Sequence, residues 1–237
     1  MLSVRKLSVE ILGSRVLRDV SFEVGAGALV YLIGRNGAGK TTSLRTVMGL
    51  RRPVSGAMEL AGRNIVGLRP FEIARMGVGF APEESEVFAE LTVAENLQIS
   101  QWLAAEKGRG QTTDDAMEAR IFALFPEVRT FLQRQGLYLS GGQKKMVAIA
   151  RAMALSPSVL LLDEAFEGLA PVVVQRFAEV VKQIKAMGIS VLIAESNLVN
   201  ATKVADRLYA IDRGEIIFEG SPQAVFDNAE VIKTIRG

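Results

Sequence analysis

A glycine-rich segment that directly follows an apolar run constrains this chain more than any other feature. The segment "GRNGAGKTT" (34–42) comes after "ALVYLI" (28–33) and before a helix-like stretch. It satisfies the pattern G-x-x-x-x-G-K-[ST], which between a strand and a helix predicts a phosphate-binding loop. The sequence therefore predicts a core in which a buried strand leads into this loop and a helix leads away from it.

The residue types of this loop suit the binding of a nucleotide. Glycines leave room for backbone N–H groups to close around phosphate oxygens, and the helix adds its positive N-terminal end. Lys40 is predicted to reach the β and γ phosphates, and the Thr41 hydroxyl to bind Mg²⁺. The predicted phosphate-binding residues are Gly34, Asn36, Gly37, Ala38, Gly39, Lys40, Thr41 and Thr42.

Other apolar runs predict the rest of an α/β fold. Continuous apolar character is typical of parallel strands buried on both faces. It occurs in "VGFA" (78–81), "VLLLD" (159–163), "SVLIAE" (190–195) and "LYAID" (208–212). The more alternating "LSVEIL" and "LRDVSFEV" predict an N-terminal antiparallel flank, and "DRGEIIFEG" (212–220) predicts a hairpin that turns at Arg213-Gly214.

The middle of the chain has a helical pattern instead. It extends from about residue 87 to 154, with a polar segment at 106–115 that predicts an exposed loop. We therefore expect one domain (1–237) in which a helical subdomain, about 87–154, is inserted into the nucleotide-binding core. This subdomain either docks partner subunits or only packs, and the sequence does not decide between the two.

An acidic pair ends one of the predicted strands. In "VLLLDEAFEGLAP" (159–171), Asp163 and Glu164 close the apolar run. Ligands of open α/β sheets bind at the carboxyl ends of strands. We expect Asp163 to hold Mg²⁺ through water, and Glu164 to polarise the attacking water as a general base.

A second glycine motif identifies a family resemblance. Ser140, Gly141, Gly142 and Gln143, in "LSGGQ", precede a helix with apolar residues at i, i+3, i+4 and i+7. The phosphate loop, this motif and the acidic pair, in that order, resemble the ATP-binding subunits of ABC transporters. The resemblance implies a P-loop NTPase fold, ATP and Mg²⁺ as cofactors, and two copies or homologous subunits paired head to tail. Ser140–Gln143 of one copy would then contact the ATP held by Lys40 of the other.

Finer features resemble the branched-chain, or hydrophobic, amino-acid uptake branch of that family. They are "PEESEVFAELTVAENL" (82–97), "ALFPEV" (123–128) and the ending "FEGSPQAVFDNAEVIKTIRG". That branch commonly has a glutamate at the position of Glu83, which the resemblance places at the metal. The resemblance also implies permease subunits as partners, an indirect link to a substrate-binding protein, and a place on the inner face of the cell membrane.

Three positions depart from the family pattern. Ser196 stands where a histidine usually reaches the terminal phosphate, and the chain contains no histidine. Ile11 or Leu12 stands where an aromatic residue usually stacks on adenine, so we expect weaker base selectivity. Ala165 replaces the proline that usually follows the acidic pair. We expect hydrolysis to depend on Glu164 and Lys40, with Ser196 as a weaker hydrogen-bond donor than histidine.

Composition excludes some functions and leaves alternatives. A net charge of +2 over 237 residues argues against nucleic-acid binding, and the absence of cysteine excludes disulfides and thiolate metal sites. No apolar run reaches the roughly 18–20 residues of a membrane span. The main alternative is a nucleotide-dependent dimerising clamp with weak or partner-dependent hydrolysis. A mechanical ABC protein acting on DNA or ribosomes would normally carry two cassettes or a long coiled coil.

Overall fold

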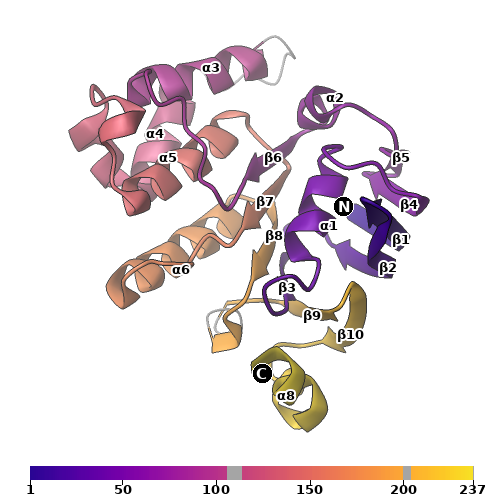
Figure 1. Ribbon diagram of the computed structural model, residues 1–237. Coiled ribbons are helices and arrows are strands. Elements are labelled where there is room, and N and C mark those ends of the chain that lie inside the picture. The colour runs from indigo at the N-terminus through magenta and orange to yellow at the C-terminus, as the bar shows by residue number, and fades with distance from the viewer. Residues whose placement is uncertain (106–113, 200–203, 237) are drawn as a thin grey trace.

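The computed structural model describes residues 1–105, 114–199 and 204–236, which form two sheets and surrounding helices (Figure 1). One sheet has six strands in the order β10-β9-β3-β8-β7-β6, and the other has four in the order β2-β1-β4-β5. No helix in the described part of the chain is long and apolar enough to cross a membrane. The α/β fold with a mainly parallel sheet and an antiparallel N-terminal flank is confirmed.

The six-stranded sheet is formed by the continuous apolar runs of the sequence. Four neighbouring strands pair in parallel, and β9 joins them in parallel with β3. Every residue of β3, β7 and β8 is buried, as expected for strands covered on both faces. The strands are β3 (Leu29–Ile33), β6 (Val78–Ala81), β7 (Val159–Asp163), β8 (Ser190–Glu195), β9 (Arg207–Asp212) and β10 (Glu215–Gly220).

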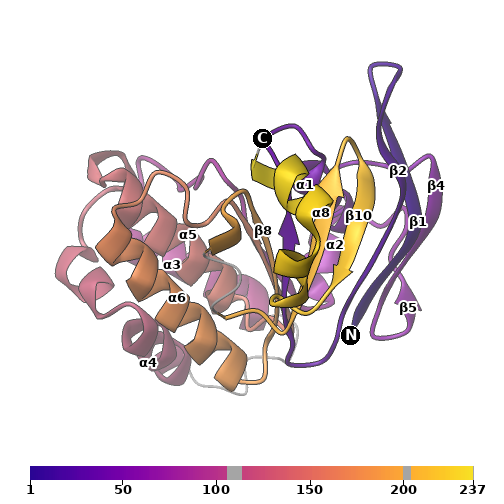
Figure 2. The ribbon, with the colours of Figure 1, turned by 90° about the horizontal axis from the view of Figure 1, so that it is seen from below.

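Alternate side chains of this sheet point into two separate cores. Tyr31, Leu160 and Ile193 face the core that includes α5 (Gly141–Ala154) and α6 (Pro171–Ala186). Leu32 and Leu161 face the opposite core, which contains α1 (Lys40–Val47) and the four-stranded sheet. Figure 2 shows these two layers on either side of the six-stranded sheet. The period-2 alternation of a strand thus builds both cores from one set of strands.

The hairpin at the end of the large sheet has the predicted turn. Strands β9 and β10 pair antiparallel, with Asp212 opposite Glu215. Both turn residues have positive φ, 45° at Arg213 and 83° at Gly214. Two left-handed residues are the mark of the type I′ turn that matches strand twist.

The four-stranded sheet contains two strands that the sequence pattern does not reveal. Strands β1 (Leu2–Ile11) and β2 (Ser14–Val24) form the predicted antiparallel flank. On the other side of β1 lie β4 (Ser55–Leu60) and then β5 (Arg63–Asn64). Only Met58 and Leu60 of β4 are buried, so this strand has too few apolar residues to give a signal.

Helices fill most of the stretch between β6 and β7, and they group together beside the six-stranded sheet (Figure 1). The predicted loop at 106–115 lies largely outside the described residues. Around this stretch are the remaining elements: α2 (Pro70–Arg75), α3 (Val93–Ala105), α4 (Asp114–Leu124), the 3₁₀ turns Pro126–Phe131 and Gly136–Tyr138, and, near the C-terminus, Ala224–Asp227 and α8 (Ala229–Arg236).

Candidate functional site

Lys40, the first residue of α1, holds its ammonium group among four oxygen atoms. Its Nζ donates to the carbonyl oxygens of Gly34 (2.8 Å) and Arg35 (3.1 Å) and to Ser196 Oγ (3.1 Å). Glu164 Oε1 lies 2.9 Å away in an ion pair whose two side chains are each 4% exposed. An ammonium has only three protons, so the protein itself saturates the group that the sequence assigns to phosphate.

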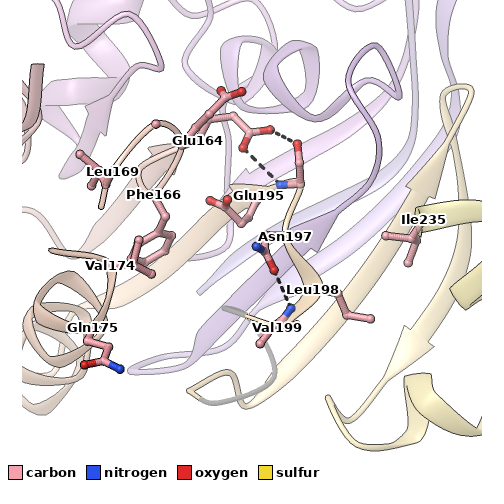
Figure 3. Close-up of a pocket in the computed structure, with 13 residues that line it drawn as sticks. Glu164, Phe166, Leu169, Val174, Gln175, Glu195, Asn197, Leu198, Val199 and Ile235 are labelled. Carbon is pink, nitrogen blue, oxygen red and sulfur yellow. Dashed lines mark hydrogen bonds between the residues drawn. The ribbon is translucent and has the colours of Figure 1, made fainter. Parts of the chain in front are cut away.

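Ser196 holds the carboxylate of Glu164 by two hydrogen bonds. Its hydroxyl lies 2.6 Å from Glu164 Oε1, and its backbone N–H donates to Oε2 at 3.2 Å. Both bonds appear as dashed lines in Figure 3. Asn36 Oδ1 lies 3.0 Å from the same hydroxyl oxygen. The structure therefore joins three predicted residues in one polar network, in which Lys40 and Glu164 are buried and Ser196 is half-buried.

Strand topology explains why residues so far apart in sequence meet here. Strands β3, β8 and β7 are parallel neighbours, with Ile33 beside Glu195 and Asp163 beside Ala194. Their carboxyl ends share one edge of the sheet, where open α/β folds bind ligands. The phosphate loop, Ser196 and Glu164 each follow one of these ends.

A second pair of predicted residues lies next to this network. Thr41 Oγ1 donates to Asp163 Oδ1 at 3.1 Å. Burial raises the pKa of Asp163 to about 6; the Thr41 hydrogen bond opposes this rise, while Glu83 and Glu164 add to it. The other carboxylate oxygen, Oδ2, is buried and has no partner among the described residues. A cation would compensate both the negative charge and the unpaired oxygen.

These residues fit Mg²⁺ bound together with a nucleotide. Among the described residues, no three His, Cys, Asp or Glu side chains form a group that could hold a metal ion. Mg²⁺ typically takes one or two carboxylates and completes its shell with water and substrate phosphates. The cavity beside the loop measures about 320 Å³. It is lined by Val16, Asn36, Gly37, Gly39, Lys40, Thr41, Thr42, Glu83 and Glu164.

The loop glycines are required mainly by the protein's own packing. A Cβ on Gly34 would come within 2.3 Å of the Ile211 carbonyl oxygen, and one on Gly39 within 2.6 Å of Leu17 Cδ2. Gly37 has open space around it but a φ of 80°. The Ala38 carbonyl accepts the Gly214 N–H at 2.9 Å, which ties the loop to the hairpin turn after β9. Close packing at Gly34 and Gly39 and the positive φ at Gly37 thus require glycine at these positions even without phosphate.

The LSGGQ residues lie apart from this cavity. Ser140 caps α5, because its side chain accepts the Gln143 N–H (3.3 Å) while Gln143 Oε1 accepts the Ser140 N–H (3.0 Å). Ser140, Gly141, Gly142 and Gln143 do not line the cavity around Lys40 in the same chain. The contact of the LSGGQ residues with ATP across a pair of cassettes stays a prediction.

Ile11 is not among the residues that line the phosphate cavity. It lies at the end of β1, partly buried against the core that the two sheets share, and Leu12 beside it is fully exposed. The β2 residue that lines the cavity is Val16, which sequence reasoning did not single out. Contact between Ile11 and the base stays a prediction.

Two further titratable residues beside the site were not predicted. Glu195 lines a cavity of about 710 Å³ next to Glu164 and Ser196 (Figure 3). Burial, and then the charge of Glu164, raise the pKa of Glu195 to about 8. Lys145 of α5 donates to backbone oxygens of the turn after β7. For Glu195, a carboxyl residue directly ending an apolar strand was an available signal, the same one that marked Asp163 and Glu164.

Comparison with known proteins decides the family. The family model for ABC transporters matches residues 17–167. The chain belongs to the ABC transporter family. This cassette is 37% identical to the high-affinity branched-chain amino acid transport ATP-binding protein BraG of Pseudomonas aeruginosa, over 98% of this chain and 97% of the relative. It is 35% identical to the lipopolysaccharide export system ATP-binding protein LptB of Acidithiobacillus ferridurans, over 94% and 90%.

Solved structures agree with the fold of this ABC cassette. A structure described as the ATP-binding subunit of an ABC transporter superposes with a TM-score of 0.85 at 28% identity, covering 100% of both chains. A nucleotide-free ATP-binding cassette gives 0.83 at 26% identity. The cassette is thus the ATP-binding subunit of an ABC transporter, an ATPase that uses ATP with Mg²⁺ and is coupled to transport.

Proposed function

We propose that this cassette drives the import of branched-chain or other hydrophobic amino acids. The similarity to BraG over nearly the full length of both chains supports this assignment. The similarity to LptB, whose name states lipopolysaccharide export, leaves export as the competing assignment. In this proposal the cassette lies on the inner face of the cell membrane, pairs with a second cassette, contacts permease subunits and depends indirectly on a substrate-binding protein.

The polar network of Lys40, Glu164 and Ser196 is the observation that carries the catalytic part of the proposal. Glu164 takes a proton from water, the water oxygen attacks the γ-phosphorus, and the bond to the β-phosphate oxygen breaks, which releases ADP. Lys40 and the loop N–H groups bind the phosphates, and Ser196 keeps the Glu164 carboxylate oriented. Thr41, Asp163 and Glu83 would hold Mg²⁺, which would supply positive charge to neutralise the phosphates.

Before this chemistry, the Lys40–Glu164 pair must open. Both side chains line the cavity but are bound to each other, so the ammonium meant for phosphate and the carboxylate meant for water are occupied by one another in this arrangement. Phosphate oxygens that take over Lys40 would free Glu164 to act on water. Ser140 and Gly142 of the second cassette would complete the site across the interface.

The experiment for the catalytic part is Mg²⁺-dependent phosphate release by the purified chain beside Glu164→Gln. Phosphate release by the wild type that is abolished in Glu164→Gln supports a working ATPase with Glu164 as its base. Binding of ATP without release by either protein favours the second candidate, a nucleotide-dependent clamp that needs its membrane partner. The closed Lys40–Glu164 pair is the specific observation that favours this second candidate.

The transport assignment needs a separate experiment. The chain is expressed in cells that lack their own branched-chain ATP-binding subunit, with Glu164→Gln as the matched control. Restored uptake of radiolabelled leucine by the wild type alone supports import. Restored lipopolysaccharide export in cells depleted of their export ATPase, without leucine uptake, would refute it.

A further inference from the structure

Lys145 reaches from α5 to the turn that follows the acidic pair. Its Nζ donates to the carbonyl oxygen of Glu164 at 2.6 Å and to that of Glu167 at 2.8 Å. Burial lowers the pKa of Lys145, and the carboxylates of Glu195, Glu167 and Glu164 oppose that shift. The ammonium therefore lies in a half-buried position, where two backbone oxygens accept its protons.

The backbone of Glu164 needs such support. Its φ is 47°, in the left-handed region that non-glycine residues rarely adopt and that surrounding contacts must enforce. Its N–H donates to the Ala194 carbonyl of β8 at 2.9 Å. Its carbonyl accepts the Glu167 N–H at 3.2 Å in addition to Lys145. Lys145 is the only one of these three partners that contributes a side chain and a charge.

The same helix carries the LSGGQ residues at its start. Ser140 caps α5, and Lys145 follows within the next two turns. Lys145 therefore links this end of α5 directly to the carbonyl of Glu164. The phosphate loop contacts the Glu164 side chain through Lys40, whereas Lys145 contacts its backbone.

We propose that Lys145 is a positioning residue for Glu164, which it aligns according to the position of the helix that begins at Ser140. This inference rests on the proposed roles of Glu164 and of the LSGGQ residues. In a head-to-tail pair, the start of α5 faces the nucleotide of the partner cassette. Lys145 thereby couples the contact of α5 with the partner's nucleotide to the alignment of Glu164, the base that acts on the nucleotide bound by its own chain.

The test compares Lys145→Met, Lys145→Arg and the matched control Lys144→Met in the full chain. The Lys144 side chain has no hydrogen-bond or ion-pair partner in the described part of the protein. We expect Lys145→Met to lower kcat at least tenfold with KM for ATP within twofold, because the base is misaligned while the phosphate loop is intact. Lys145→Arg should recover much of kcat, since a guanidinium offers donors for both carbonyls.

Two kinetic outcomes would overturn the proposal. One is a kcat of Lys145→Met within twofold of the control. The other is a lower kcat together with a correspondingly lower melting temperature and no recovery in Lys145→Arg. That result would mean that Lys145 only stabilises the fold. Hydrogen exchange of the 164–167 amides gives a readout without turnover: it should accelerate in Lys145→Met and not in Lys144→Met. An inactive wild type would count against the proposed function, while exchange unchanged by Lys145→Met would count against this inference.

Discussion

The ion pair between Lys40 and Glu164 predicts an unusual effect of Glu164→Gln on nucleotide affinity. In the free protein, Glu164 Oε1 holds the Lys40 ammonium at 2.9 Å, and it is the only charged acceptor among its four partners. Phosphate must compete with this carboxylate for Lys40. Glutamine offers a neutral oxygen in its place, so the competition weakens and binding should tighten.

The magnitude follows from the strength of the contact that binding has to break. A hydrogen bond to a charged group is worth about 1.5–3 kcal/mol, which corresponds to a roughly 10- to 100-fold lower Kd. The assay is calorimetric titration with Mg²⁺ and a non-hydrolysable ATP analogue, so that hydrolysis does not affect the comparison. Phosphate release by the same variant should be abolished.

A second variant separates this competition from simple repulsion between Glu164 and the phosphates. Glu164→Asp keeps the negative charge on a side chain that is one methylene shorter, which weakens its contact with Lys40. We expect its Kd to fall as well, by less than that of Glu164→Gln. An unchanged Kd in Glu164→Asp, beside a lower Kd in Glu164→Gln, would indicate repulsion. An unchanged Kd in both would refute the competition.

Three further predictions concern the surrounding residues. Ser196→Ala should still hydrolyse ATP, with kcat lowered roughly tenfold, because the 2.6 Å hydroxyl contact with Glu164 is lost while the backbone N–H contact remains. A kcat equal to that of the wild type would show that the hydroxyl does not contribute to hydrolysis. The pKa of Glu195 is about 8 in the folded protein, against 4.5 in the unfolded chain. Protonation of Glu195 therefore contributes to folding stability in full below pH 4.5, and this contribution is lost as the pH rises through 8. Glu195→Gln, which stays neutral, should therefore raise the melting temperature by several degrees relative to wild type at pH 9 and by much less at pH 5; an equal difference at both values would contradict the assignment. Gly34→Ala should cost about 1–3 kcal/mol of stability, since its Cβ would lie 2.3 Å from a backbone oxygen of β9. Gly141→Ala, with nothing within 4 Å, is its control, and equal melting temperatures of the two would show that the clash is relieved without cost.

Several parts of the fold were predictable because the signal is local. A strand covered on both faces must be apolar at every position, and β3, β7 and β8 are recognisable for that reason. The turn at Arg213-Gly214 was predictable because glycine adopts positive φ without steric cost. Strand β4 was missed because it buries only two side chains and is defined by pairing with β1.

The sequence by itself determined the chemistry that is present at the site. The phosphate loop, the acidic pair and the LSGGQ motif are contiguous, and each consists of residue types that its chemistry demands. The absence of histidine, with Ser196 at the strand end, was equally visible.

Only the tertiary structure decided how these groups contact one another. It showed Lys40 bound to Glu164, the hydroxyl of Ser196 on the same carboxylate, and Lys145 supporting the backbone of Glu164. It also placed Val16 in the lining of the phosphate cavity, which does not include Ile11. The physical reason is that these contacts join strand ends, loops and a helix that are far apart in the sequence. Lys40 and Ser196, for example, are 156 positions apart. Distances between such segments depend on the packing of the whole sheet, which no local pattern of residues encodes.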